Sequence, residues 1–476
     1  MWSYRLVLLL VACAPKPDDS TGAANEHSTG QSTGGEPTTD PGPPTTSTGT
    51  TDSTGEPTTG HIPTSTCITA PQTHDACPDP CPLTVDVEIQ CDDPSFGVSG
   101  LRVAASPDVV WLATASATDS FLHAAGLGET IRVELPAELD HGTILLATAP
   151  SGELHLAAEP IGVGDIVHLA EADGWQPSQV VPQRTLLDFE VDLAGTPHLW
   201  LADPDGYSEV LRVDDIWTEV LALAPDMALK PHFGLTRDGT TFGVGVRAVE
   251  GTYQLSSLVV DQAEDLGAPT PLYEYRVAPL ATPVAPVDGP DIVFTHLHPD
   301  GLRVAWQAAP GLLVPEAAPL EPSCPIIITN EKNCPATCHD TAIGVEPGAF
   351  MVARTGDGRG WLAHLTTHLD HKVTYTPKVA DIFGDYCDGA VHDDHDTGVL
   401  HLYELGFDGA QPTARLSLPI AAPALRDLDL FDNLYTGADR RPFDLRAFAS
   451  SLAIGLRTRD SATGVLAVRL LRFETG

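Results

Sequence analysis

Short runs of alternating apolar and polar residues fill the chain from residue 67 to its end, and Gly, Asp and Pro separate these runs. Successive side chains of a β-strand point to opposite faces, so this alternation predicts many short strands. The 3.6-residue period of helices is hard to find, and proline is too frequent for long helices. The pattern therefore predicts an all-β domain over residues 67–476.

A turn motif recurs within this domain. Gly-x-x-His-Leu begins at Gly152, Gly195 and Gly398, and looser copies follow Gly239 and Gly301. Glycine suits such turns because it adopts positive φ without a Cβ clash. Counted from the turns, candidate second strands start near Val109, Leu154, His198, Phe242, Ile292, Phe350, Leu400 and Leu452.

The spacing of these strands predicts the architecture. Successive starts lie 44 to 58 residues apart, and a four-stranded propeller blade takes about 40–50 residues. A β-sandwich or a two-domain arrangement should not give even spacing over so long a stretch. We therefore predict a single β-propeller of seven or eight four-stranded blades, which follows a disordered N-terminal tether.

One segment carries a family resemblance. Residues 191–200 read Val-Asp-Leu-Ala-Gly-Thr-Pro-His-Leu-Trp, which resembles the Asp-x-x-Gly-x-Pro-His-Ile-Ala-Tyr repeats of bacterial secreted β-propellers. The resemblance implies that Gly195 closes the hairpin between the first two strands of a blade.

The last blade needs a strand from elsewhere. The chain ends with the strand-like run 464–473, after which no fourth strand follows, whereas residues 83–89 near the start form a clean alternating strand. We expect this N-terminal strand to complete the C-terminal blade, because that pairing removes the open sheet edges.

The N-terminus predicts export. Residues 1–12 combine a basic residue with an apolar run, as secretory signals do. Residues 10–13, Leu-Val-Ala-Cys, resemble the bacterial lipobox, which implies that Cys13 is acylated and anchors the protein in a membrane. Ala14, in place of Asp, then favours the outer membrane. The alternatives are an ordinary signal peptide or a wrongly assigned start codon, with Cys13 unmodified.

Residues 13–66 are expected to form the tether. Between residues 28 and 60 nearly every residue is Ser, Thr, Gly or Pro. Such a composition cannot bury enough apolar surface to offset the ordering entropy, so we predict a disordered linker. As a flexible coil it would span roughly 40 Å.

Eight further cysteines predict disulfides, because an exported chain meets an oxidising compartment. They fall into two clusters of four, with Cys-rich segments at 67–91 and 324–338. The spacing leaves three pairings open in each cluster, and a four-cysteine zinc site is the other interpretation. The cysteines are Cys67, Cys77, Cys81, Cys91, Cys324, Cys334, Cys338 and Cys387.

Two stretches rich in His and Asp are candidates for metal binding. On a strand, His364, His368 and Asp370 would share one face, next to His371. The denser stretch holds His392, Asp394, His395 and Asp396, which could bind Ca²⁺ through oxygens or Zn²⁺ through nitrogens. Surface histidines and a turn before Gly398 are the plainer interpretations, so no cofactor is predicted outright.

Charge limits the partners. Residues 67–476 carry a net charge of −35, which excludes nucleic acid and basic docking on anionic lipids. The charge otherwise serves solubility or attracts cations.

No nucleophile elbow or phosphate-binding loop occurs. We therefore expect a monomeric, membrane-anchored binding or scaffold propeller of the cell envelope, with a protein, glycan or peptide ligand. The alternative is an extracytoplasmic hydrolase or lyase that uses a divalent metal near residues 364–401.

Overall fold

The structure is a computed structural model of the chain. It describes residues 66–72, 82–92, 96, 101–115, 120–126, 130–133, 135, 143–159, 165–182, 184–203, 206–214, 216–223, 229–235, 239–249, 252–259, 270–275, 281–284, 293–298, 300–306, 312–315, 317–320, 337–381, 384–406, 410–421, 423–424, 443–459 and 465–476. The predicted signal, Cys13 and the linker lie outside these residues, apart from Thr66. Within the described ranges, no helix is long and apolar enough to cross a bilayer.

The described residues form seven antiparallel sheets. Blade 1 consists of β3 (Leu101–Ala105), β4 (Val109–Ala115), β5 (Ser120–Gly126) and β6 (Thr130–Val133). Blade 2 consists of β7 (Thr143–Thr148), β8 (Leu154–Glu159), β9 (Asp165–Ala170) and β10 (Ser178–Pro182). Blade 3 consists of β11 (Thr185–Val191), β12 (Pro197–Asp203), β13 (Gly206–Val213) and β14 (Ile216–Leu223). Blade 4 consists of β15 (Leu229–Leu235), β16 (Thr241–Val249), β17 (Thr252–Val259) and β18 (Thr270–Tyr275).

The remaining sheets hold the C-terminal half and the N-terminal strands. Blade 5 consists of β19 (Ala281–Val284), β20 (Val293–His298), β21 (Gly301–Trp306) and β22 (Leu312–Leu313). Blade 6 consists of β23 (Thr337–Arg354), β24 (Gly360–Asp381), β26 (Thr397–Leu405) and β27 (Thr413–Ala421), with β25 (Gly384–Asp394) paired to β24. Blade 7 consists of β28 (Phe443–Phe448), β29 (Ser451–Arg459), β30 (Leu466–Glu474), β2 (Leu83–Cys91) and β1 (Cys67–Pro71).

The sheets close into a ring. The first strand of each blade contacts the first strand of the next, in the order β3, β7, β11, β15, β19, β23 and β28, and β28 contacts β3 again. These seven strands therefore surround a common axis, and the fold is a β-propeller. The core lies between neighbouring blades, where for example the ring of Trp361 in blade 6 meets that of Phe473 in blade 7, with centroids 5.6 Å apart.

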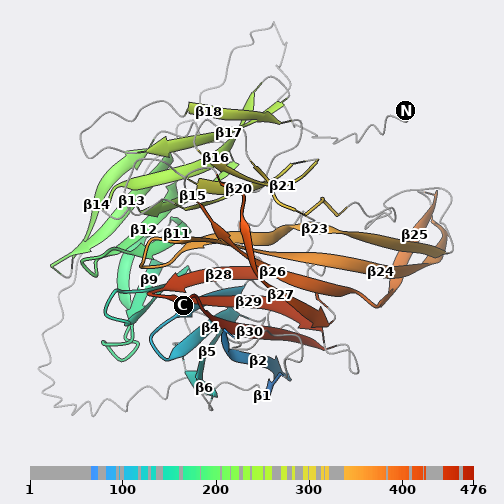
Figure 1. The fold of residues 1–476 in the computed structure, drawn as a ribbon, viewed down its shortest axis with the longest axis horizontal. Coiled ribbons are helices and arrows are strands. Elements are labelled where there is room, and N and C mark those ends of the chain that lie inside the picture. Colours follow the sequence, from blue (N-terminus) through green and yellow to red (C-terminus); the bar gives the residue numbers. More distant parts are fainter. Residues whose placement is uncertain are drawn as a thin grey trace, which may run out of the picture. The chain divides into compact units, whose positions relative to one another are not determined.

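The N-terminal strand completes blade 7, as predicted. In Figure 1 the blue β2 lies beside the dark red β30, and the two strands pair antiparallel from Leu83 opposite Phe473 to Gln90 opposite Ala467. A buried ion pair joins them, because Asp86 accepts hydrogen bonds of 2.9 and 2.8 Å from the guanidinium of Arg469. The two ends of the domain therefore share one sheet.

The turn glycines are in part as expected. Gly152, Gly195 and Gly239 have φ of 91°, 87° and 83° and lie in the turns between the first and second strands of blades 2, 3 and 4. In blade 6, however, Gly358 holds that position, with φ of 91°, and Gly398 lies inside β26. The expectation that Gly398 closes such a turn is wrong.

Blade 6 also explains why the spacing predicts eight second strands, whereas the structure has seven blades. Phe350 lies on β23, the innermost strand, and Leu400 lies on β26, the third strand of the same sheet. The spacing assigns Phe350 and Leu400 to the second strands of two separate blades. Because they lie in one sheet, the eight predicted second strands correspond to seven blades. The cause is the length of β23 and β24, which contain 18 and 22 residues and so stretch the apparent repeat.

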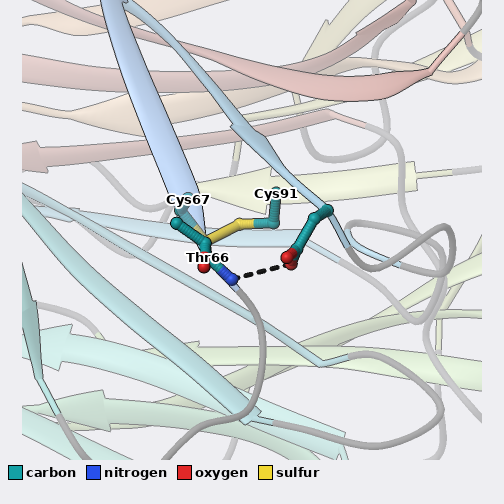
Figure 2. Close-up of a disulfide and its surroundings, with 4 residues drawn as sticks. Thr66, Cys67 and Cys91 are labelled. Atoms are coloured by element: carbon teal, nitrogen blue, oxygen red, sulfur yellow. Dashed lines mark hydrogen bonds between the residues drawn. A yellow bond between two sulfur atoms is a disulfide. The ribbon is translucent and has the colours of Figure 1, made fainter.

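One predicted disulfide is present. Cys67 and Cys91 are bonded and stand directly opposite each other on β1 and β2 (Figure 2). Next to them the backbone N–H of Thr66 donates to the carboxylate of Asp92 at 2.7 Å. Cys77, Cys81, Cys324 and Cys334 lie outside the described residues, as do the side chains of Cys338 on β23 and Cys387 on β25. That these six cysteines form disulfides stays a prediction.

Candidate functional site

Ionisable side chains collect on the innermost strands around the axis. We call six of them the axial charge cluster; they come from blades 3, 4, 6 and 7 and are Asp188, Glu190, His232, Arg354, Asp444 and Arg446. The charges of Arg446 and Arg354 both act on Glu190, although these three residues belong to three different blades. The ring therefore brings together charges that are far apart in the sequence.

The local sequence of β11 explains how its two carboxylates are placed. Asp188 and Glu190 alternate with Phe189, so the acids share one face of the strand while the phenyl ring enters the core at 1% exposure. The carboxylate of Asp188 accepts the backbone N–H of Phe233 at 2.9 Å, and that of Glu190 accepts the N–H of Leu235 at 2.9 Å. Both acceptors therefore tie blade 3 to blade 4.

Blades 7 and 1 are joined in the same way. Asp444 is fully buried, and its Oδ2 accepts the backbone N–H of Val103 at 2.8 Å. Its Oδ1 lies 3.9 Å from Nε of Arg446 and makes no hydrogen bond to another described residue. The hydrogen bond from Val103 therefore ties blade 1 to blade 7 at the axis.

Glu190 of the cluster has a shifted pKa. Burial raises the pKa of Glu190, and the neighbouring charge of Asp188 adds to this, whereas Arg446, Arg354 and the N–H of Leu235 oppose it without reversing it. The side chains of Glu190, Arg354 and Arg446 are nevertheless only half-buried, so each keeps contact with solvent. His232 extends the cluster, with Nδ1 lying 3.7 Å from the carboxylate of Asp188. The arrangement can exchange a proton at Glu190 and offers guanidinium groups to a polar ligand.

A second network explains the histidine of the repeat motif. His198 is 5% exposed, and its Nδ1 lies 2.7 Å from Glu209 while its Nε2 lies 3.5 Å from Asp192 in the turn. Thr241 of blade 4 donates to the same Glu209 at 2.7 Å. The motif therefore fastens the turn of blade 3 to its third strand and to the next blade, which is a structural role.

This network predicts a pH dependence of stability. Burial lowers the pKa of His198, but the hydrogen bond and charge of Glu209, with Asp192, outweigh burial and raise it overall. Protonated His198 then stabilises the fold below about pH 6.5, and this contribution is lost as the pH rises through the raised pKa. The urea midpoint of the unaltered chain should therefore fall between pH 6 and pH 8.5, and this fall should be smaller in His198→Gln. An equally large fall in the variant would contradict this role.

The predicted histidine stretch of β24 does not form a joint site. His364 is fully buried and stacks on His401 and Tyr403, with centroids 4.8 and 5.6 Å away, and burial lowers its pKa to about 3. His368 and Asp370 are exposed, although they share its strand face as expected. Asp370 instead pairs with His339 on β23 at 2.7 Å. The side chain of His371 lies outside the described residues.

The second predicted stretch spans the end of β25 and the following connection. His392 and Asp394 lie on β25, and their side chains are outside the described residues. His395 is exposed, and Asp396 is 8% exposed and accepts the backbone N–H of Asp370 at 2.9 Å. The described side chains of 364–401 do not bring three metal-ligand atoms together. A metal site formed by His392, Asp394, His395 and Asp396 stays a prediction.

Two segments of the sequence already carry the pattern of the axial charge cluster. Residues 186–191 read Leu-Leu-Asp-Phe-Glu-Val and residues 443–448 read Phe-Asp-Leu-Arg-Ala-Phe, so charges alternate with core residues on both strands. Charged residues on a strand with a buried face need partners or a special environment. Which strands meet at the axis, however, follows only from the closed ring.

Comparisons with known proteins find similarity to solved structures only. No family model matches the chain, and no curated protein sequence matches it. A protein of unknown function from Dyadobacter fermentans is similar in structure, with a TM-score of 0.37 and 11% identity over 71% of this chain and 96% of that one. An oligogalacturonate lyase in complex with manganese gives 0.35 and 9% over 78% and 97%. The periplasmic gluconolactonase of Pseudomonas aeruginosa gives 0.33 and 13% over 78% and 94%.

Proposed function

We propose that this protein is a binding propeller of the cell envelope, held at a membrane by a lipid on Cys13, and that its ligand binds at the axial charge cluster. The observation that carries the proposal is that Glu190, Arg354 and Arg446 lie on the innermost strands of three blades, near enough for both guanidinium charges to act on Glu190. Binding sites commonly combine a few converging polar groups with perturbed pKa values in this way.

The chemistry of the cluster favours a small hydroxylated organic acid. A guanidinium group binds a carboxylate through two parallel hydrogen bonds, which Arg354 and Arg446 can offer. Glu190, whose pKa burial raises, can donate a hydrogen bond to a hydroxyl oxygen when protonated and accept one when ionised. The cluster thus offers two guanidinium groups to an acid, although the whole domain carries a net charge of −35.

The ligand class can be tested by calorimetric titration of hydroxy acids and of their uncharged amides. Loss of a charge-assisted hydrogen bond costs about 1.5–3 kcal/mol, so we expect Arg446→Gln to weaken binding of the acid by about 10- to 100-fold. Glu190→Gln should weaken it too, and the amides should bind poorly to the unaltered chain.

A matched control separates this effect from a general loss of charge. Arg415 on β27 forms an ion pair with Glu404 at the surface, where it is 48% exposed, so Arg415→Gln should leave binding unchanged. If no hydroxy acid binds the unaltered chain, or if both axial variants bind as the unaltered chain does, the axial site is wrong.

A second function remains open for the same residues. A carboxyl group with a raised pKa is suited to act as a general acid, so the cluster also fits a hydrolase or lyase. Product formation from a bound acid, lost in Glu190→Gln, would favour the enzyme. The metal-dependent version with its site near 364–401 predicts a stoichiometric metal that His392→Ala together with His395→Ala removes.

A further inference from the structure

Cys67, Cys91 and His123 bring three metal-ligand atoms to one place in the fold. The two sulfur atoms and a ring nitrogen of His123 all lie within 4.8 Å of one another, and no other such group occurs among the residues that the structure describes. The cysteines belong to β1 and β2 of blade 7, whereas His123 belongs to β5 of blade 1. In the oxidised chain both sulfurs are used by the disulfide.

The backbone holds the two cysteines together independently of the sulfur–sulfur bond. They are direct cross-strand partners in a ladder that runs from Cys67 opposite Cys91 to Pro71 opposite Val87. Beyond them the Thr66 N–H donates to the carboxylate of Asp92 at 2.7 Å (Figure 2). The Asp92 N–H donates in return to the Thr66 carbonyl at 2.9 Å. Two thiols would therefore stay side by side after reduction.

His123 is held in place by a different part of the fold. Its strand β5 pairs with β4 on one side and β6 on the other. The ring is 2% exposed and meets the edge of Phe96 at a centroid distance of 6.2 Å. Since neither contact depends on the cysteines, reduction should leave the imidazole where it is.

We propose that this trio is a redox-gated metal site that binds Zn²⁺ through two thiolates and one imidazole once the disulfide is reduced. A dithiol reductant attacks Cys67, which is the more exposed cysteine; it becomes a disulfide itself and leaves Cys67 and Cys91 as thiols. Zinc binding then releases one proton from each thiol, and water fills the fourth position.

The geometry and charge suit this ion. Bonds of about 2.3 Å to sulfur and about 2.0 Å to nitrogen in a tetrahedron put the ligand atoms roughly 3.5–3.8 Å apart, which is compatible with their closeness in the fold. Two thiolates neutralise Zn²⁺, so the buried complex carries no net charge. Reduction and zinc binding would thus replace the disulfide between β1 and β2 by a metal-mediated cross-link that also includes blade 1.

The test is protection from alkylation in the reduced full chain. A metal-bound thiolate is a poor nucleophile, so stoichiometric Zn²⁺ should slow the reaction of Cys67 and Cys91 with iodoacetamide by about tenfold or more, measured by peptide mass spectrometry. Co²⁺ should give thiolate-to-metal charge-transfer bands that the oxidised chain lacks.

Variants identify the ligands. The double variant Cys67→Ser and Cys91→Ser should bind one Zn²⁺ fewer than the reduced unaltered chain, and His123→Phe should abolish the protection while keeping an aromatic ring in place. His155→Phe, which alters a buried histidine of blade 2, should leave it intact. Equal alkylation rates with and without Zn²⁺ in the unaltered reduced chain would overturn the proposal, whether or not any variant folds.

Discussion

Replacing Asp86 by Ala is expected to lower the free energy of unfolding of the propeller by about 3–5 kcal/mol, because it leaves a buried guanidinium without its carboxylate. Asp86 and Arg469 are 2% and 9% exposed and join the N-terminal strand to the C-terminal one. Urea denaturation followed by tryptophan fluorescence measures the change.

A surface pair provides the control for this prediction. Glu404→Ala removes an ion pair on the outside of blade 6, where Arg415 is 48% exposed, and should cost less than about 1 kcal/mol. Deleting residues 67–92 should destabilise the whole domain more than either substitution does. If the deletion leaves the melting temperature unchanged, blade 7 does not depend on β2 and the closure is wrong.

Replacing His364 by Phe is expected to make the propeller more resistant to acid. Burial, with the neighbouring charge of His401, lowers the pKa of His364 to about 3, and neither ring nitrogen has a hydrogen-bond partner among the described residues. Below about pH 6.5 His364 binds a proton in the unfolded chain but not in the folded chain. As the pH is lowered further, the free energy of unfolding falls by about 1.4 kcal/mol per pH unit until the pH reaches the folded pKa.

The measurement compares two pH values, so that any packing cost of the new ring cancels. The gain of His364→Phe over the unaltered chain should be about 2 kcal/mol larger at pH 5 than at pH 7.5. His368→Phe, four residues along the same strand and exposed, should show no such difference. Equal gains at both pH values for His364→Phe would mean that the buried imidazole accepts its proton in the folded state.

The strand that closes the ring could be predicted, because residues 83–89 alternate strictly and the last blade has no fourth strand of its own after residue 473. The blade number could not, because β23 and β24 run well past the length of a blade strand and mimic an extra repeat. The conspicuous histidines were misleading for a similar reason. His364 is buried among aromatic rings, whereas a local pattern cannot distinguish such a core position from a ligand.

The axial cluster lies beyond what local patterns can predict. Glu190, Arg354 and Arg446 are separated by more than 90 residues at each step, and only the ring order of the innermost strands brings them together. Asp188 and Glu190 also serve the fold, since each accepts a backbone N–H of blade 4. Variants at these positions therefore need a binding measurement as well as a stability measurement.

A crystal structure of the full chain with the hydroxy acid that binds most tightly tests the central claim most directly. The account predicts that the carboxylate of the acid lies within hydrogen-bond distance of Arg354 or Arg446, with a hydroxyl group at Glu190. An acid seated on the outer strands or on the long ribbon of β24 and β25, with only water beside Glu190, would contradict it.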